Sequence, residues 1–300
     1  MQNYIVVGGL MKKTITQEIE LLEFLKQNFL QSSTNKLRKM LSNGRIKINS
    51  EIVHKAKYKL QENDIFELLD KPTQIQTPKS KIKVKNLSID IIYEDDYILV
   101  VEKPAKLLSV ATDKLEGNTL HSKCVDYLKQ SDAKAWAYIV HRLDKETSGI
   151  MLLAKTKSGK EYLQEQFSNR SVYRTYHALV EGKLSPKSGT VEQYLIEDKH
   201  LNINPTSKTN KHGKLAITHW EALSNYESST LVRLMIETGR RHQIRMAMKS
   251  IGHPIVGDTL HGAEANPVSR ICLHATSLEF LHPQSDEPMR FEAKHNFAKL

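Results

Sequence analysis

Two short apolar runs enclose a polar stretch near the middle of the chain, and this arrangement restricts the local fold more than any other feature. The runs cover residues 136–140 and 150–154, and both have the length and the β-forming residues of buried strands. Between them, residues 141–149 read His-Arg-Leu-Asp-Lys-Glu-Thr-Ser-Gly, and the final glycine suits a tight turn. The pattern predicts a polar loop held between two strands.

This polar stretch has two interpretations. It could be an ordinary hairpin in which Asp144 and Thr147 cap their own turn. Alternatively, the carboxylate of Asp144 and the guanidinium of Arg142 are reactive groups that two rigid strands keep in position. Loop residues on a rigid scaffold often carry function, so the stretch by itself leaves both interpretations open.

The composition is that of a globular protein with a preference for anionic partners. A length of 300 residues suggests about two domains, and 39% hydrophobic with 26% charged residues allows a sizeable core. The net charge of +10 favours an anionic partner, of which nucleic acid is the commonest. A solvated lysine-rich surface would have the same composition.

Cysteine usage and hydropathy argue against several classes of protein. Cys124 and Cys272 form no Cys-x-x-Cys pair, which argues against a disulfide framework and a zinc ribbon and fits a reducing compartment. No apolar run approaches the roughly 20 residues of a membrane-spanning helix. Residues 1–10 lack the basic region of a secretory signal. We therefore expect a soluble cytoplasmic protein with no membrane association.

The first 70 residues predict a compact module of two short helices and a small sheet. Helical spacing begins after Thr16 and again after Ser32-Ser33, and strand patterns cover residues 45–49 and 64–69. The module resembles the alpha-L RNA-binding domain, a ribosomal-protein type, through the turn at residues 44–49 and the later Asn-Asp-Ile. Candidate RNA contacts are the basic residues of the second helix and the following strand, namely Lys36, Arg38, Lys39, Arg45 and Lys47.

A change of composition separates this module from the rest. Residues 71–86 contain two prolines, polar residues and lysines without apolar periodicity, as in a semi-extended linker. The predicted domains are therefore residues 12–70 and 87–300. Beyond the linker, strands are predicted at 89–93, 97–102, 172–180 and 229–237, helices at 115–128 and from a Ser158 capping box, and a loop or hairpin at 197–215.

Residues 238–249, read as a helix, have an apolar and a basic face. Ile244, Ala247, Met248 and Ile251 form the inward stripe, whereas Arg241, Arg245 and Lys249 are spaced four residues apart. A solvated basic face is the common explanation of such spacing. The helix follows a Thr-Gly turn at a strand end, where ligand sites often form, and this favours a functional face.

Three stretches in this order resemble the signatures of the ribosomal large-subunit (RluA-type) family of RNA pseudouridine synthases: residues 141–149, 176–182 and 239–245. The resemblance continues through residues 252–258 and 273–275 and covers residues 87–291. It implies an α+β catalytic domain with a central, mostly antiparallel mixed sheet flanked by helices and loops, beside the small α/β alpha-L domain.

The family resemblance also implies a reaction and roles for particular residues. Uridine in RNA is flipped out and isomerised to pseudouridine without a cofactor or a metal. Asp144 would be the catalytic aspartate, Tyr176 would pack on the flipped base, and Arg245 would pair with Asp144. Arg142 would refill the gap in the RNA stack, because a planar guanidinium can stack on bases. His141 and Arg241 are further candidate RNA contacts.

Some positions depart from the family pattern. Lys106 stands where the family usually has Gly, and His261 stands where Tyr is usual. Met246 and Ala247 replace a Val-His pair. None of these residues belongs to the predicted catalytic trio.

Other functions fit the sequence less well. A kinase would need a Gly-rich loop and an Asp-Phe-Gly motif, and a metal hydrolase would need clustered ligands; the sequence has neither. A non-catalytic RNA-binding or ribosome-assembly factor on the same fold is the main alternative. The expected partner is RNA, with ribosomal RNA favoured and transfer RNA the alternative, and a monomer is expected.

Overall fold

The computed structural model describes residues 5–7, 10–30, 32, 34–42, 44–69, 82–84, 89–112, 116–295 and 297. The chain divides into two compact units. The first comprises Met1–Thr77, Glu165–Val172 and Glu279–Arg290, and the second comprises Pro78–Gln164, Tyr173–Leu278 and Phe291–Leu300.

Within the first unit, the N-terminal segment forms a small sheet with two helices. Its five strands occur in the order β1 (Ile5–Val7), β2 (Leu10–Thr14), β7 (Ile65–Leu68), β4 (Ile46–Ile48) and β5 (Glu51–Ile52). The helices are α1 (Leu21–Asn28) and α2 (Thr34–Ser42), and β3 (Ile19–Glu20) pairs with β6 (Lys59–Leu60). Leu25 of α1 and Leu37 of α2 are buried in one core with Phe66 of β7, which explains the apolar spacing of both helices.

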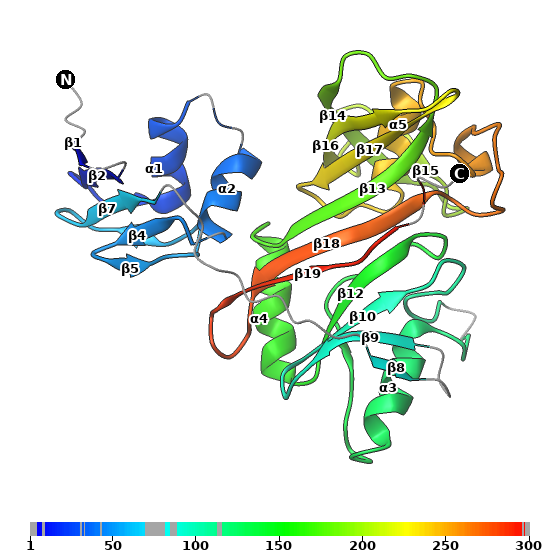
Figure 1. Ribbon diagram of the computed structural model, residues 1–300, viewed down its shortest axis with the longest axis horizontal. Helices are drawn as coiled ribbons and strands as arrows, with labels where there is room; N and C mark the ends of the chain where they lie inside the picture. The colour runs from blue at the N-terminus through cyan, green and yellow to red at the C-terminus, as the bar shows by residue number, and fades with distance from the viewer. Residues whose placement is uncertain are drawn as a thin grey trace. The chain divides into compact units, whose positions relative to one another are not determined.

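The second unit contains a long mixed sheet (Figure 1). Its main path is β15 (Ile203–Thr206), β14 (Ser188–Glu197), β16 (Lys214–Asn225), β17 (Ser229–Ile236), β13 (Tyr173–Glu181), β18 (Leu273–Leu281), β12 (Ser148–Ala154), β10 (Ile98–Lys103), β9 (Ile89–Glu94) and β8 (Ile82–Val84). In addition, β11 (Tyr138–Ile139) pairs with β12, and β19 (Pro288–Glu292) pairs with β18.

Most of the pairings in this sheet are antiparallel. Neighbours such as β10 with β12, β13 with β17 and β16 with β17 run antiparallel, whereas β12 and β18 run parallel. The predicted α+β class with a mostly antiparallel mixed sheet is therefore confirmed.

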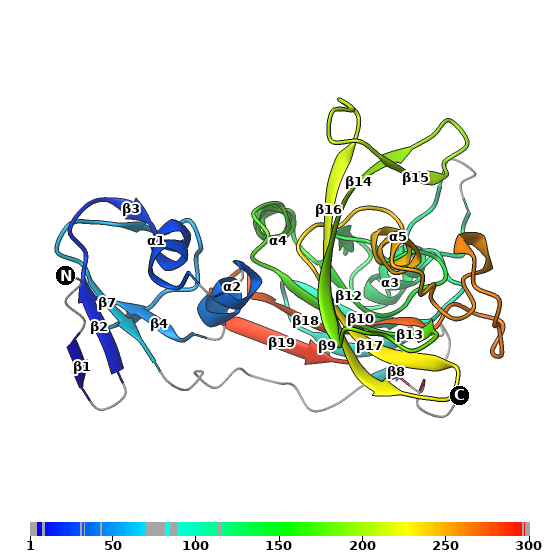
Figure 2. The ribbon, with the colours of Figure 1, turned by 90° about the horizontal axis from the view of Figure 1, so that it is seen from above.

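Three helices and a short 3-10 turn accompany this sheet. They are α3 (Leu120–Lys129), α4 (Lys157–Ser168), α5 (Gln243–Ser250) and η1 (Thr259–His261). Helix α5 contacts β14, β15 and β16, and Figure 2 shows it beside that end of the sheet. Of the predicted apolar stripe, Ile244, Ala247 and Met248 are almost inaccessible to solvent, whereas Ile251 follows the end of the helix and is half-buried.

Several helices begin at other residues than the sequence predicts. Helix α1 begins at Leu21 rather than after Thr16, since Ile19 and Glu20 pair as β3. Helix α3 begins at Leu120 because Thr119 forms a capping box with Ser122. At α4, the hydroxyl of Thr156 accepts a hydrogen bond from the Gly159 amide, so the cap lies ahead of the predicted Ser158.

The predicted linker falls largely outside the described residues, which omit 70–81 and 85–88. The part that is described, residues 82–84, forms β8 and pairs with β9. The sheet therefore begins before residue 87, while the boundaries 12–70, 71–86 and 87–300 stay a prediction. Among the described residues, no helix is long and apolar enough to cross a membrane.

Gly149 lies where β12 and β18 approach most closely. It pairs with Ala275 and has φ +119°, a conformation that L side chains rarely adopt. A Cβ atom there would lie 2.2 Å from the carbonyl oxygen of Ala275. No side chain fits without separating the two strands.

We expect Gly149→Ala to lower the free energy of unfolding by at least about 3 kcal/mol, because overpacking and a left-handed backbone both oppose it. Urea denaturation of the variant and the unchanged chain measures the difference. Gly117→Ala is the matched control, since a Cβ atom at Gly117 meets nothing within 4 Å. Equal losses in the two variants would contradict the role of the close approach between the strands.

Candidate active site

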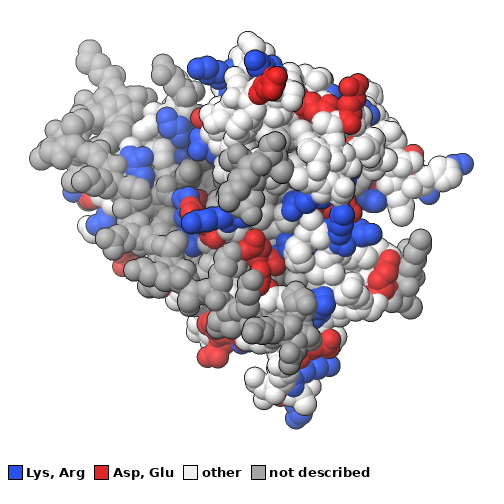
Figure 3. Space-filling model, turned by 45° about the vertical axis from the view of Figure 1, so that its right-hand side comes forward, with Lys and Arg blue, Asp and Glu red and all other residues white. Residues whose placement is uncertain are grey.

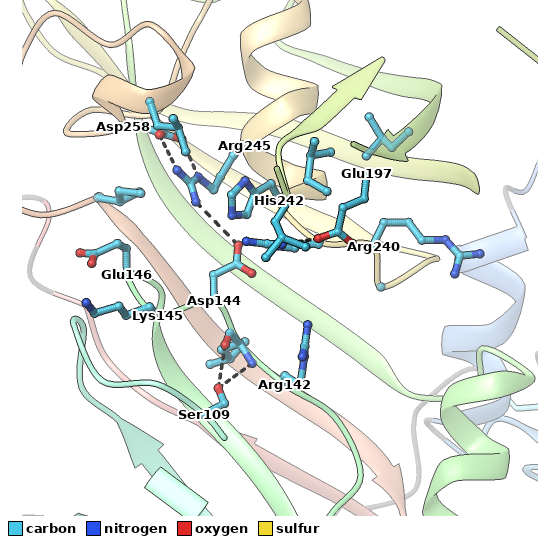
Figure 4. A pocket seen from close by; sticks show the side chains of 18 of the residues that line it. Ser109, Arg142, Asp144, Lys145, Glu146, Glu197, Arg240, His242, Arg245 and Asp258 are labelled. Atoms are coloured by element: carbon cyan, nitrogen blue, oxygen red, sulfur yellow. Dashed lines mark hydrogen bonds and ion pairs between the residues drawn. The ribbon is translucent and has the colours of Figure 1, made fainter. Parts of the chain in front are cut away.

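A large pocket lies in the second unit, with a volume of about 1470 Å³. This exceeds the roughly 300–1,000 Å³ of small-molecule sites and suits an extended ligand. Its walls come from five parts of the chain that are distant in sequence: residues 108–112, 142–146, 195–203, 211–214 and 239–271 in part. Figure 4 shows Asp144 in this pocket between Arg245 and Arg142.

Asp144 lies on the loop between β11 and β12, as the flanking apolar runs predicted. The pairing of Ile139 with Leu153 closes the hairpin. The Ser109 hydroxyl donates to the Leu143 carbonyl at 2.6 Å and accepts from the Leu143 amide at 3.1 Å. This side chain fixes the loop immediately before Asp144.

A buried lysine supports the same loop. The side chain of Lys103, at the end of β10, is inaccessible to solvent, and its ammonium donates to the carbonyls of Pro104 (3.0 Å), Leu107 (2.7 Å) and Lys145 (3.0 Å). Burial lowers the pKa of Lys103 to about 8, although the nearby carboxylates of Asp144 and Glu146 oppose this. Lys103 therefore joins the turn after β10 to the residue that follows Asp144.

Arg245 approaches Asp144 but pairs more closely with another carboxylate. Its Nη1 atom lies 4.0 Å from Oδ2 of Asp144, beyond hydrogen-bond range. Its Nε and Nη2 atoms instead donate to Oδ2 and Oδ1 of Asp258, both at 2.7 Å. The predicted Asp144–Arg245 pair is thus a long ion pair, and the sequence did not suggest Asp258 as a partner.

The electrostatic environment of Asp144 contains opposing effects. Burial raises the pKa of its carboxyl group, whereas the positive charges of Arg245, Arg241, Arg142 and Lys103 act to lower it. The side chain keeps 28% of its surface exposed, toward the pocket. No hydrogen bond to its carboxylate is found among the described residues, so both oxygens are available to a ligand.

Tyr176 lies on β13 and is almost fully buried. Burial raises the pKa of its phenol, Arg174 opposes the shift, and Asp144 adds to it. The hydroxyl is therefore protonated at neutral pH. Asp144 influences this pKa because the structure brings the two predicted residues near each other. Asp144 lies on the loop before β12 and Tyr176 on β13, and helix α4 lies between these strands in the sequence.

The two residues at the start of the polar loop have different environments. Arg142 is exposed and lines the pocket. His141 instead accepts a hydrogen bond through Nε2 from the Leu152 amide of β12, at 3.0 Å. Burial, followed by the charge of Arg174, lowers the pKa of His141 to about 3, so the ring is neutral and supports the hairpin.

The basic stripe predicted on a helix is not a solvent-exposed face. Helix α5 begins at Gln243, so Arg241 lies in the preceding turn, where its guanidinium forms an ion pair with Glu197. Arg245 is buried and faces Asp258, whereas Lys249 is exposed. Arg241, Arg245 and Lys249 are thus four residues apart in sequence but have three different environments.

The basic residues predicted in the N-terminal segment lie on α2 and β4 or between them. Lys36 is exposed, whereas Arg38 and Lys47 are half-buried. Arg45 donates through Nε to the Leu69 carbonyl at 2.8 Å, so part of its side chain stabilises the module. The side chain of Lys39 lies outside the described part of the structure.

Two departures from the family pattern have clear structural settings. Lys106 has φ +67°, the left-handed conformation that glycine adopts most easily, at a position where the family usually has Gly. His261 is buried, and its Nδ1 atom lies 2.9 Å from Asp258.

Lys103, Ser109 and Asp258 were not predicted as site residues, because their partners lie in other segments of the chain. No cluster of residues suited to a metal ion occurs in the described ranges.

The fold places an aspartate in a pocket that several basic side chains line. The family model for RNA pseudouridylate synthase matches residues 97–250, and the model for the S4 domain matches residues 21–66. The chain belongs to the RNA pseudouridine synthase family and carries an S4 RNA-binding domain. Both resemblances expected from the sequence are confirmed.

Known relatives extend over most of the chain. An uncharacterized RNA pseudouridine synthase of Bacillus subtilis, YjbO, is 34% identical over 83% of this chain and 86% of its own length. Ribosomal large subunit pseudouridine synthase C of Vibrio cholerae is 31% identical over 89% of this chain and 88% of its own length. The structure of human RNA pseudouridylate synthase domain containing 4 has a TM-score of 0.57 at 24% identity and covers 69% of this chain and 89% of its own, which supports the fold.

We expect Lys103→Met to lower the free energy of unfolding by roughly 3 kcal/mol or more. Three buried carbonyls lose their hydrogen-bond donor, and each loss costs about 1 kcal/mol or more. Turnover should also fall, since the loop that carries Asp144 loses its support. Urea denaturation and the rate of pseudouridine formation measure the two effects. Lys106→Met, an exposed lysine on the same turn, should change neither by much.

Proposed function

We propose that the enzyme isomerises uridines of large-subunit ribosomal RNA, with Asp144 as the catalytic aspartate. The observation that carries this proposal is the position of Asp144, whose carboxylate lies in the large pocket 4.0 Å from the buried guanidinium of Arg245. The name of the Vibrio cholerae relative supports ribosomal RNA as the substrate. Transfer RNA is the alternative substrate.

The reaction conserves all atoms and electrons of the substrate. The C1′–N1 bond breaks, the uracil turns, and a C1′–C5 bond forms while a proton leaves C5 and N1 gains one. Asp144 either attacks C1′ as the glycosidic bond breaks, giving an ester that the turned uracil displaces, or it removes the C2′ proton as that bond breaks, giving a glycal to which the proton returns when the C1′–C5 bond forms. Because the isomerisation is redox-neutral, we propose that it needs no cofactor.

Tyr176 and Arg142 have separate roles in this proposal. Tyr176 packs on the flipped base, and because burial keeps its own phenol protonated, it assists by positioning C5 for a base or water that takes the proton. Flipping a base costs a few kcal/mol, and a planar guanidinium that enters the vacated stack offsets part of that cost. Arg142 suits this task because it is exposed at the pocket.

Basic and acidic side chains occur together on one face of the molecule (Figure 3). On the face shown in Figure 3, lysine and arginine side chains are interspersed with acidic ones. Phosphate binding by such a surface depends on particular basic residues, and we propose that the S4 segment supplies some of them through Lys36, Arg38, Lys39, Arg45 and Lys47. We assign His141 a supporting role in the hairpin, and Arg241 would reach RNA only by leaving Glu197.

We further propose that the protein acts as a monomer in the cytoplasm. Its two cysteines are buried and free, as expected in a reducing compartment. The predicted domains, residues 12–70 and 87–300 joined by the linker 71–86, remain part of this proposal.

We expect cells that carry only Asp144→Asn to lose pseudouridine at one or more sites of large-subunit ribosomal RNA, because an amide cannot replace the carboxylate at C1′. Mapping pseudouridines in total RNA measures this, with Asp126→Asn, an exposed residue of α3, as the control. Loss confined to transfer RNA would favour the alternative substrate. Retention of every site would contradict the proposed catalytic role.

We expect Lys36→Gln with Lys47→Gln to weaken RNA binding and to reduce the log–log salt slope of affinity by about 0.9 for each phosphate that the protein no longer neutralises. Binding measured at several salt concentrations gives the slope. Lys26→Gln is the control, because its ammonium already pairs with Glu23 of α1. An unchanged slope in the double variant would show that these lysines do not bind RNA.

A further inference from the structure

Asp258 is a buried carboxylate whose hydrogen bonds all serve the catalytic pocket. Its side chain is inaccessible to solvent, and it receives hydrogen bonds from Nε and Nη2 of Arg245, both at 2.7 Å. A third interaction comes from Nδ1 of His261 at 2.9 Å. An ionised carboxylate only accepts hydrogen bonds, so the imidazole must be the donor.

The bidentate pair determines which part of Arg245 remains for Asp144. A guanidinium binds a carboxylate best along one edge, with two parallel hydrogen bonds. Asp258 occupies the Nε–Nη2 edge, and only Nη1 faces Asp144, at 4.0 Å (Figure 4). Arg245 therefore contributes its charge to Asp144 without capturing either oxygen in a short hydrogen bond.

The pair between Asp258 and Arg245 is costly to build. Both side chains are buried, with exposed fractions of 0% and 6%. Buried ion pairs contribute little net stability, because desolvation offsets much of their attraction. A geometric role accounts for the pair better than a stabilising one, since it sets the orientation of a single guanidinium beside Asp144.

A second layer holds Asp258 itself. His261 is 5% exposed and ends the 3-10 turn that begins one residue after Asp258. The ring of His242 packs edge to face on His261, with 5.0 Å between the centroids. The contacts thus run from His242 through His261 and Asp258 to Arg245, and each residue is positioned by the one before it.

We propose that Asp258, held by His261, is a positioning residue that occupies one edge of Arg245 and so keeps Asp144 free to react. This inference rests on the proposed roles of Asp144 and Arg245. Asp258 belongs to the pocket wall, but its side chain has no exposed surface, so we expect it to make no contact with RNA. Its removal should therefore change turnover rather than substrate binding.

We expect the charge on Asp258 to affect the titration of Asp144 through Arg245, which lies between the two carboxylates. Hydrogen bonds and charges from Arg245 and His261 outweigh burial and lower the pKa of Asp258 to about 2, so it is ionised throughout a practical assay range. The charged groups that face Asp144 are Arg245, Arg241, Arg142 and Lys103. Without the negative charge of Asp258, the positive charge of Arg245 would no longer be partly neutralised, and its Nε–Nη2 edge would have no carboxylate partner. The ionised form of Asp144 would then be favoured more strongly, so the pKa of Asp144 would fall.

The first test is Asp258→Asn in the full-length enzyme, assayed on an RNA fragment that contains a mapped target uridine. Asparagine replaces one carboxylate oxygen with an NH2 group, which only donates, so it cannot keep both parallel hydrogen bonds from Arg245. We expect kcat to fall about 100-fold, as a misplacement of about 1 Å can cause. We also expect an unchanged Kd for RNA and a shift of the acid limb of the kcat–pH profile to lower pH.

Substitutions of His261 supply a second test that leaves the buried ion pair in place. His261→Leu removes the donor to Asp258 and should lower kcat about tenfold, whereas His261→Asn keeps a donor close to the position of Nδ1 and should stay within about threefold. Glu264→Gln removes an exposed carboxylate from the same segment and is the control. Thermal unfolding of each variant identifies losses caused by misfolding.

The outcomes separate this inference from the proposed function. If Asp144→Asn is inactive while Asp258→Asn keeps kcat within about twofold, or its acid limb stays in place or moves to higher pH, the positioning role is wrong. If Asp258→Asn does not fold, the His261 pair decides, and equal activity of His261→Leu and His261→Asn overturns the role. Activity that survives Asp144→Asn would instead remove the proposed mechanism.

Discussion

Strand β18 comes from the end of the chain but lies between β12 and β13 in the sheet, with its backbone against Gly149. The loop before β12 carries Asp144, and β13 carries Tyr176. Because β18 lies between β12 and β13, it determines how far apart the segments that carry Asp144 and Tyr176 are. The parallel pairing is possible only because Gly149 has no side chain, so the geometry of the site depends on one residue without a Cβ atom.

The loop that carries Asp144 is held by groups outside it. Lys103 binds carbonyls on both the β10 turn and the loop, and Ser109 binds both backbone groups of Leu143. These hydrogen bonds are buried, where a missing partner is costly. Among the described residues, no hydrogen bond to the Asp144 carboxylate is found, which suits the catalytic role that we propose for it.

Positive charge around Asp144 has several sources, and they are not equivalent. Arg245 forms hydrogen bonds with Asp258, and Arg241 forms an ion pair with Glu197. Lys103 donates hydrogen bonds to backbone carbonyls, whereas Arg142 is exposed. Together they oppose the effect of burial on the pKa of Asp144. A partly desolvated carboxylate thus lies near four cations, of which Arg142 is the exposed one.

Much of the fold class and part of the candidate site follow from local patterns in the sequence. The apolar runs beside residues 141–149 predicted the strands around Asp144, and the inward stripe of α5 was buried as its spacing required. Local spacing could not reveal that Arg241, Arg245 and Lys249 have different surroundings, because α5 begins only at Gln243. The partnership of Arg245 with Asp258, the support from Lys103 and the insertion of β18 were decided by tertiary structure. Each depends on contacts between segments far apart in the chain, which residue order alone does not specify.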